Sequence, residues 1–143
     1  MSKRDDIHAV GAEWVKKAEN DLTAASHTLT LGEKCPTDAV CFHVQQCVEK
    51  YLKAVLVLEE IPFPKTHDIE EIVLLLPLPL RPTLTKDEQG FLTEYATGPR
   101  YPGWGEVSLT EARRAVALAR RVRKEIRAKL PKEVLRRRSV KEE

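Results

Sequence analysis

The sequence has few of the residues on which disulfide scaffolds, metal centres and membrane spans depend. Its 143 residues include only three cysteines, Cys35, Cys41 and Cys47, whose odd number and spacing fit neither a disulfide framework nor a zinc site. No run approaches the roughly 20 apolar residues that a membrane span requires. The N-terminal MSKRDDIHAV also lacks the apolar core of a signal peptide. We therefore expect a cytoplasmic protein that does not bind membranes.

Several motifs that are typical of cofactor-binding or metal-binding sites are also missing. The sequence has no phosphate-cradling GxxxxGK[ST] loop, no GxGxxG, no HExxH and no Cys/His cluster with zinc spacing. We expect neither a cofactor nor a metal site.

Helical periodicity and helix-capping residues predict an all-α fold. The apolar residues recur at helical spacing in five segments, which span about 10–31, 38–60, 68–76, 86–97 and 108–130. Prolines and glycines separate these segments, and no stretch shows the sustained alternation of a strand. The short connections favour antiparallel neighbours. We therefore predict an up-and-down antiparallel bundle of four to five helices, with one domain over residues 1–130 and a basic tail over residues 131–143.

Charge is distributed unevenly along the chain. Residues 1–110 hold 11 Lys/Arg and 17 Asp/Glu, whereas residues 111–143 hold 13 Lys/Arg and 5 Asp/Glu. A cationic segment on an acidic body is able to contact nucleic acid or an acidic partner. An ordinary solvated helix face followed by a basic tail would give the same pattern.

Polar side chains interrupt the second predicted helix, which is otherwise apolar around most of its circumference. They are Gln45, Gln46, Glu49, Lys50 and Lys53, and they fall with their neighbours within an arc of roughly 160° at about 100° per residue. The arc fits either an ordinary polar face with internal ion pairs, or a lined cleft or polar dimer seam. Asp21 of the first predicted helix is a candidate partner for Lys50, Lys53 or Arg100.

Two loops add further candidates. His67 precedes a predicted helix start, where outward-pointing N–H groups favour an anion, although Thr-His-Asp at such a position also suits capping and packing. Arg100 and Tyr101 lie in a loop rich in glycine and proline. An arginine beside an aromatic ring suits phosphate pairing and base stacking, or the packing of a loop against the end of the bundle.

Three motifs together resemble the HEPN domain family. They are FHVQQCVEKYLKAVL at 42–56, PKTHDIEEI at 64–72 and RYP at 100–102, and the resemblance covers about residues 14–130. It implies a helical bundle that commonly forms a homodimer, paired with a small nucleotidyltransferase in a toxin–antitoxin-like system. It also implies that one groove is lined by Gln46, Lys50, Lys53, His67 and Arg100.

Some members of this family are metal-independent ribonucleases built on an Arg-x(4–6)-His motif. That motif is absent here, because Arg4 and His8 are separated by three residues and no histidine follows Arg81 or Arg100. His67 and Arg100 are then the remaining candidates for catalysis, and we expect a binding function rather than an enzyme.

The leading hypothesis is a nucleotide- or RNA-binding module, in which lysines and an arginine without an obvious internal partner hold the phosphate. The ligand-binding candidates are Gln46, Lys50, Lys53, His67, Arg100 and Tyr101, with Tyr101 stacking on a base. A homodimer seam that docks a partner enzyme is the first alternative. A ribonuclease with a rearranged site is the second.

Overall fold

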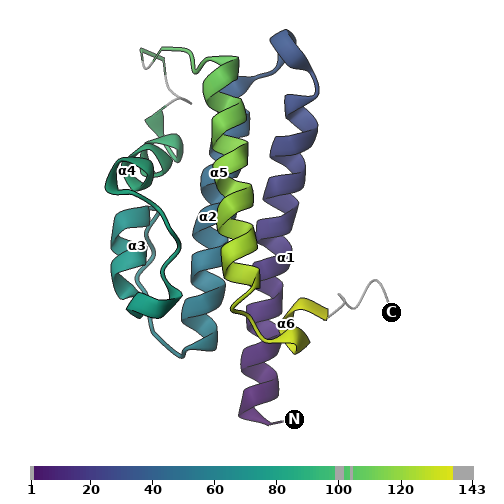
Figure 1. Cartoon of the computed structure of the whole chain (residues 1–143), viewed down its shortest axis with the longest axis vertical. Helices are drawn as coiled ribbons and strands as arrows, with labels where there is room; N and C mark the ends of the chain where they lie inside the picture. The colour runs from purple at the N-terminus through teal and green to yellow at the C-terminus, as the bar shows by residue number, and fades with distance from the viewer. Residues whose placement is uncertain (1, 99–101, 104, 137–143) are drawn as a thin grey trace.

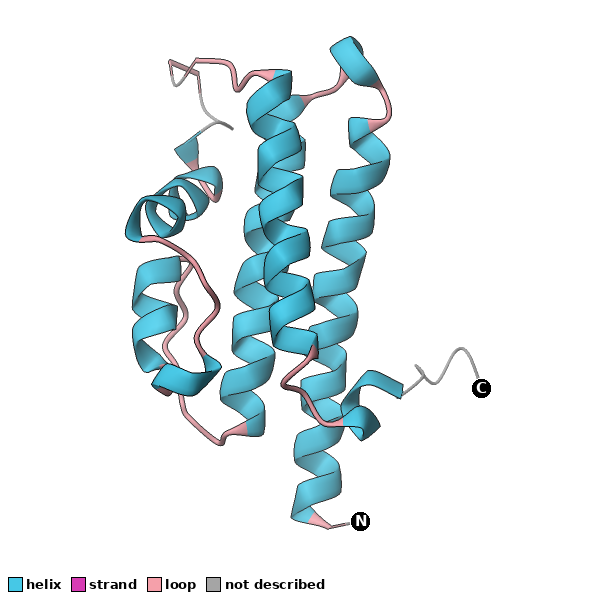
Figure 2. Ribbon diagram, in the orientation of Figure 1, coloured by secondary structure: helices cyan, strands magenta, loops and turns pink. Residues whose placement is uncertain are grey.

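The computed structural model describes residues 2–98, 102–103 and 105–136, and it is helical (Figures 1 and 2). The elements in chain order are α1 (Lys3–Leu29), η1 (Gly32–Lys34), α2 (Thr37–Leu58), α3 (Ile69–Leu75), η2 (Leu78–Leu80), α4 (Lys86–Tyr95), α5 (Leu109–Arg127) and α6 (Lys132–Arg136). No strand occurs among the described residues. The predicted all-α bundle is confirmed.

Three long helices, α1, α2 and α5, form the body of the bundle (Figure 1). The helices α1 and α2 are antiparallel, as expected from their short connection. The α3–α4 arm carries the chain back toward the start of α2, so α5 runs in the same direction as α2 (Figure 1). A hydrogen bond of 2.6 Å from Thr37 Oγ1 to the carbonyl oxygen of Val107 joins the beginnings of these two helices.

The centre of the bundle is α2, whose apolar side chains meet α1, α5 and the α3–α4 arm. Its residues with no exposed surface include Val40, Cys41, Val44, Cys47, Val48, Tyr51, Leu52 and Ala54. At its far end α2 lies very close to α1, because a Cβ atom on Gly11 would lie 2.8 Å from Leu58 Cδ2. This glycine therefore allows the two helices to approach.

Capping residues explain where the helices begin. The first helix starts at Lys3, well before the predicted residue 10, because Ser2 and Asp5 form a capping box. In it Ser2 Oγ accepts from the Asp5 N–H at 3.1 Å. Thr85 and Glu88 form a second capping box at the start of α4.

The C-terminal part of the bundle differs from the sequence-based bounds. The helix α5 ends at Arg127 rather than near residue 130, and Pro131 separates it from the short α6. Val134 of α6 is 2% exposed and belongs to the hydrophobic core. The rest of the predicted basic tail, residues 137–143, lies outside the described residues. None of the helices in the described ranges combines the length and apolar character needed to cross a membrane.

Candidate functional site

A buried carboxylate, Glu49, organises the polar side chains of α2. Its residue is 3% exposed, and its two oxygens accept hydrogen bonds from three side chains. Gln45 Nε2 lies 3.0 Å and His67 Nδ1 lies 2.8 Å from Oε1, while Lys53 Nζ lies 2.9 Å from Oε2. A buried charge is stable only when it is paired and hydrogen-bonded, and Glu49 satisfies both conditions.

These contacts decide the ionisation of the carboxyl group. Burial by itself raises the pKa of Glu49, but the hydrogen bonds from Lys53, His67 and Gln45 outweigh it, and the net pKa is lowered. Glu49 is therefore an ionised carboxylate at neutral pH.

Lys53 is held inside the protein rather than offered to a ligand. Its residue is 7% exposed, and its Nζ also donates to the carbonyl oxygen of Thr66 at 3.2 Å. The same Nζ lies 5.7 Å from the ring centroid of Trp14 and 5.6 Å from that of Phe63, so both rings are within cation–π distance. The lysine thus ties α2 to α1 and to the proline-rich loop after α2.

The loop that carries His67 is anchored to α2 through its backbone as well. Gln45 Nε2 donates to the carbonyl oxygen of His67 at 2.9 Å. The next residue, Asp68, caps α3 by accepting from the Glu71 N–H at 3.1 Å. The His67 side chain is nevertheless 65% exposed. One ring nitrogen is fixed by Glu49, and Nε2 has no protein partner among the described residues.

Gln46 belongs to the same network. Its Nε2 donates to Gln45 Oε1 at 2.7 Å, and its side chain lies on the half-buried face of α2. Gln46, Lys53 and His67, three of the residues predicted to share a site, are therefore joined through Gln45 and Glu49. We call these five side chains the Glu49 cluster.

A second polar cluster lies between α2 and α1. The carboxylate of Asp21, whose residue is 8% exposed, accepts from Lys50 Nζ at 2.6 Å and pairs with His43 Nδ1 at 2.8 Å. The prediction that Asp21 could pair with Lys50 is confirmed. His43 contacts this carboxylate, and its ring also packs edge-on against Phe42.

The sequence-based view of the lysines needs a correction. The leading hypothesis took Lys50 and Lys53 to have no obvious internal partner, but each lies within hydrogen-bond distance of a buried carboxylate, as the alternative of a polar face with internal ion pairs requires. Their charges are therefore already compensated. Arg100 and Tyr101 lie outside the described residues, and their place in the site stays a prediction.

Sequence reasoning did not identify Gln45 and Glu49 as the frame of the site. The signal was present in their spacing, because Gln45, Glu49 and Lys53 recur every four residues and so form one ridge of α2. On a helix that is apolar on almost every side, the polar side chains of such a ridge need hydrogen-bond partners inside the protein.

Among the described residues, no group of three or more His, Cys, Asp or Glu side chains is placed to hold a metal ion.

Comparisons with known proteins agree with this architecture. The family model of the HEPN domain matches residues 12–129. A solved structure, the crystal structure of TT1696 from Thermus thermophilus, is similar with a TM-score of 0.69 and 24% sequence identity. The match covers 84% of this chain and 98% of that one, and at this identity it shows the fold alone. No curated protein matches the sequence. With the family model covering most of its length, the chain belongs to the HEPN domain family.

Proposed function

We propose that the protein is a nucleotide- or RNA-binding module whose recognition surface is the Glu49 cluster. Membership of the HEPN domain family supports a role connected with nucleotides or RNA. The observation that carries the proposal is the position of His67. Its side chain is 65% exposed, and its Nδ1 pairs with the buried Glu49 carboxylate at 2.8 Å. An exposed imidazole held in one orientation is preorganised for a ligand.

The lysines of α2 contribute to this surface as a frame rather than as phosphate ligands. The pair of Lys53 with Glu49 and the pair of Lys50 with Asp21 each carry no net charge. The groups left for a ligand are an imidazole and an amide, which both donate and accept hydrogen bonds. Such groups suit the edge of a base or a ribose hydroxyl. We keep the prediction that Arg100 pairs with a phosphate and that Tyr101 stacks on a base.

Titration of the protein with ATP and with a short labelled single-stranded RNA tests this proposal. The variant Gln46→Ala/His67→Ala removes the half-buried amide and the exposed imidazole, and it retains Gln45, Glu49 and Lys53. Losing two hydrogen bonds is expected to cost about 1–3 kcal/mol, or roughly 5- to 150-fold in affinity. His8→Ala, which removes an imidazole from the partly exposed start of α1, is the matched control. Equal binding by the double variant and the wild type contradicts the proposal.

We further propose that the module works in the cytoplasm as a homodimer, paired with a small nucleotidyltransferase in a toxin–antitoxin-like system. The family resemblance supports this pairing. Exposed apolar side chains on the α3–α4 arm, Leu74, Leu78 and Phe91, also favour a surface that a protein covers. Light scattering of the purified chain and co-expression with the neighbouring genes test it. A monomer at high micromolar concentration excludes the homodimer.

A metal-independent ribonuclease is a second candidate, favoured by the geometry of His67 and Glu49. A histidine oriented by a carboxylate is able to take the proton of a ribose 2′-hydroxyl, whose oxygen then attacks the phosphorus as the 5′-oxygen leaves with a proton. Arg100 is the candidate that would stabilise the charge on the phosphate. Cleavage of RNA in excess chelator by wild type and His67→Ala separates the two candidates. Equal cleavage by both proteins removes His67 from any catalytic role.

A further inference from the structure

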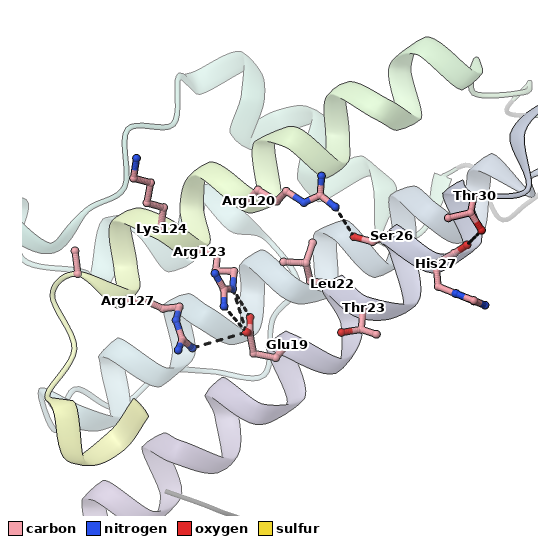
Figure 3. Close-up of a pocket in the computed structure, with 11 residues that line it drawn as sticks. Glu19, Leu22, Thr23, Ser26, His27, Thr30, Arg120, Arg123, Lys124 and Arg127 are labelled. Atoms are coloured by element: carbon pink, nitrogen blue, oxygen red, sulfur yellow. Dashed lines mark hydrogen bonds and ion pairs between the residues drawn. The ribbon is translucent and has the colours of Figure 1, made fainter. Parts of the chain in front are cut away.

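A second, chemically different site candidate is the groove between α1 and α5 (Figure 3). We call it the basic groove, and it has a volume of about 1110 Å³. Its lining consists of Glu19, Leu22, Thr23, Ser26, His27 and Thr30 on α1, and Arg120, Arg123, Lys124, Arg127 and Ala128 on α5. Glu19 in this groove and Asp21 beside the Glu49 cluster are two residues apart, about 200° around α1. The two sites therefore open on different sides of that helix.

Positive charge exceeds negative charge in the basic groove. Arg123 binds the Glu19 carboxylate through two nitrogens, at 2.8 Å each, and Arg127 Nη1 lies 3.8 Å from the same carboxylate. Arg120 instead donates to the hydroxyl of Ser26 at 3.0 Å, and this neutral partner leaves its charge uncompensated. Lys124 is exposed and points outward from the edge of α5 (Figure 3). Among the described residues, the lining thus holds one carboxylate and four cations.

The α1 side of the groove adds hydrogen-bond donors in a row. Thr23, Ser26 and His27 lie at helical spacing on α1, and the C-cap residue Thr30, whose hydroxyl donates to the His27 carbonyl at 2.6 Å, extends this stripe to about 10 Å along the helix. The cations at positions 120, 123, 124 and 127 form a stripe of the same length on α5. A row of donors suits an extended polyanion better than a single phosphate group. Among the described residues, no Phe, Tyr or Trp side chain lines the groove.

We propose that the basic groove binds the sugar–phosphate backbone of single-stranded RNA without regard to base sequence. Arginine and serine or threonine hydroxyls are typical ligands of phosphate oxygens. An acidic protein segment fits the observations less well, because protein interfaces depend on aromatic or apolar anchors and the lining offers only Leu22, which is 8% exposed, and Ala128. The inference rests on the proposed function in one respect, that the ligand is RNA.

Salt-dependent binding of a short labelled oligouridylate to the full chain tests the proposal. The groove variant is Arg120→Ala/Lys124→Ala, and its matched control is Arg114→Ala/Lys129→Ala, which removes two exposed cations that do not line the groove. Each phosphate contact contributes about 0.7 to the slope of log K against log salt, so the groove variant should flatten the slope by about 1.4. If the wild type and the groove variant bind equally at about 1 M salt, the difference in slope makes the groove variant bind roughly 25-fold more weakly at about 0.1 M. The control should keep the wild-type slope.

The same measurement separates this proposal from the proposed function. Gln46→Ala/His67→Ala removes no formal charge and should lower affinity without changing the slope. A groove variant with the slope of its control overturns the proposal, whatever the α2 variant does. Binding of a polyglutamate peptide that competes with RNA and is lost in the groove variant overturns it as well, since the occupant is then an acidic protein segment.

Discussion

Replacing Glu49 by alanine should cost more stability than any other single polar change on α2. The substitution leaves Lys53, whose residue is 7% exposed, as a buried ammonium without its carboxylate. It also removes the acceptor of Gln45 and His67. Breaking a buried pair by removing one partner costs about 3–5 kcal/mol, a large part of the 5–15 kcal/mol that typically stabilises a domain.

Removing both charges together should be far less damaging. In Glu49→Leu/Lys53→Met no buried charge is left, and the methionine is able to pack between the rings of Trp14 and Phe63. We expect a loss of about 1 kcal/mol, from the hydrogen bond that Gln45 no longer makes.

The folded pKa of Glu49 lies below its ordinary value of 4.5, so its stabilising contribution is present above that value and is lost as the pH falls through the folded pKa. The double variant should therefore approach the wild type in stability as the pH is lowered below about 4.5.

Urea unfolding followed by far-ultraviolet circular dichroism measures these differences. With a denaturant slope of about 2 kcal/mol/M, Glu49→Ala should lower the unfolding midpoint by about 2 M without changing the slope. A loss below about 1 kcal/mol for Glu49→Ala would refute the view of Glu49 as the centre of the cluster. A double variant as unstable as the single one would show that packing, rather than an unpaired charge, causes the loss.

Three further predictions concern the buried parts of the bundle. Tyr51→Phe removes a 2.5 Å hydrogen bond to the Glu19 carboxylate and should lower the free energy of unfolding in urea by about 1.5–3 kcal/mol. An unchanged free energy of unfolding would show that solvent replaces the contact. Gly11→Ala places a Cβ 2.8 Å from Leu58 Cδ2, the end of a flexible and only partly buried side chain that is able to rotate away, so the helix-propensity gain of about 1 kcal/mol should prevail. A lowered melting temperature would contradict that. Burial first, then nearby carboxylates, raise the pKa of Cys41 to about 12, so iodoacetamide at about pH 8.5 should alkylate it only as fast as the protein unfolds. Rapid labelling of the native protein would show an accessible thiol.

Helix existence was predictable because the local signals agree with one another. The apolar spacing of α2, the prolines after it and the cap at Thr85 predict helix boundaries that lie within two residues of those in the structure. The start of α1 was missed because its first turns hold few apolar residues, while Ser2 and Asp5 are enough to cap it. The parallel course of α2 and α5 follows from the α3–α4 arm, whose path depends on tertiary packing.

The sequence placed Gln46, Lys53 and His67 together, and the structure joins them, but the sequence did not predict the contacts that join them. The pair of Glu49 and Lys53 follows from their i,i+4 spacing within α2, but the pair of Lys50 and Asp21 depends on how α1 and α2 are rotated about their axes, which is decided by packing, such as the contact at Gly11. The hydrogen bonds that Gln45 and Lys53 of α2 donate to backbone carbonyls of the following loop leave no trace in residue identity. For the basic groove, the sequence showed only the excess of Lys and Arg over residues 111–143. It did not show which segment forms the opposite wall, since Arg120 and Ser26 are 94 positions apart in the chain.

One nuclear magnetic resonance titration tests the central claim most directly. The sequence has four histidines, His8, His27, His43 and His67, and their imidazole resonances report on different surfaces. Addition of a short single-stranded RNA should shift the ring signals of His67 at the Glu49 cluster and of His27 in the basic groove, and leave those of His8 in place. A His67 signal that does not move at saturating RNA would contradict recognition on the α2 face.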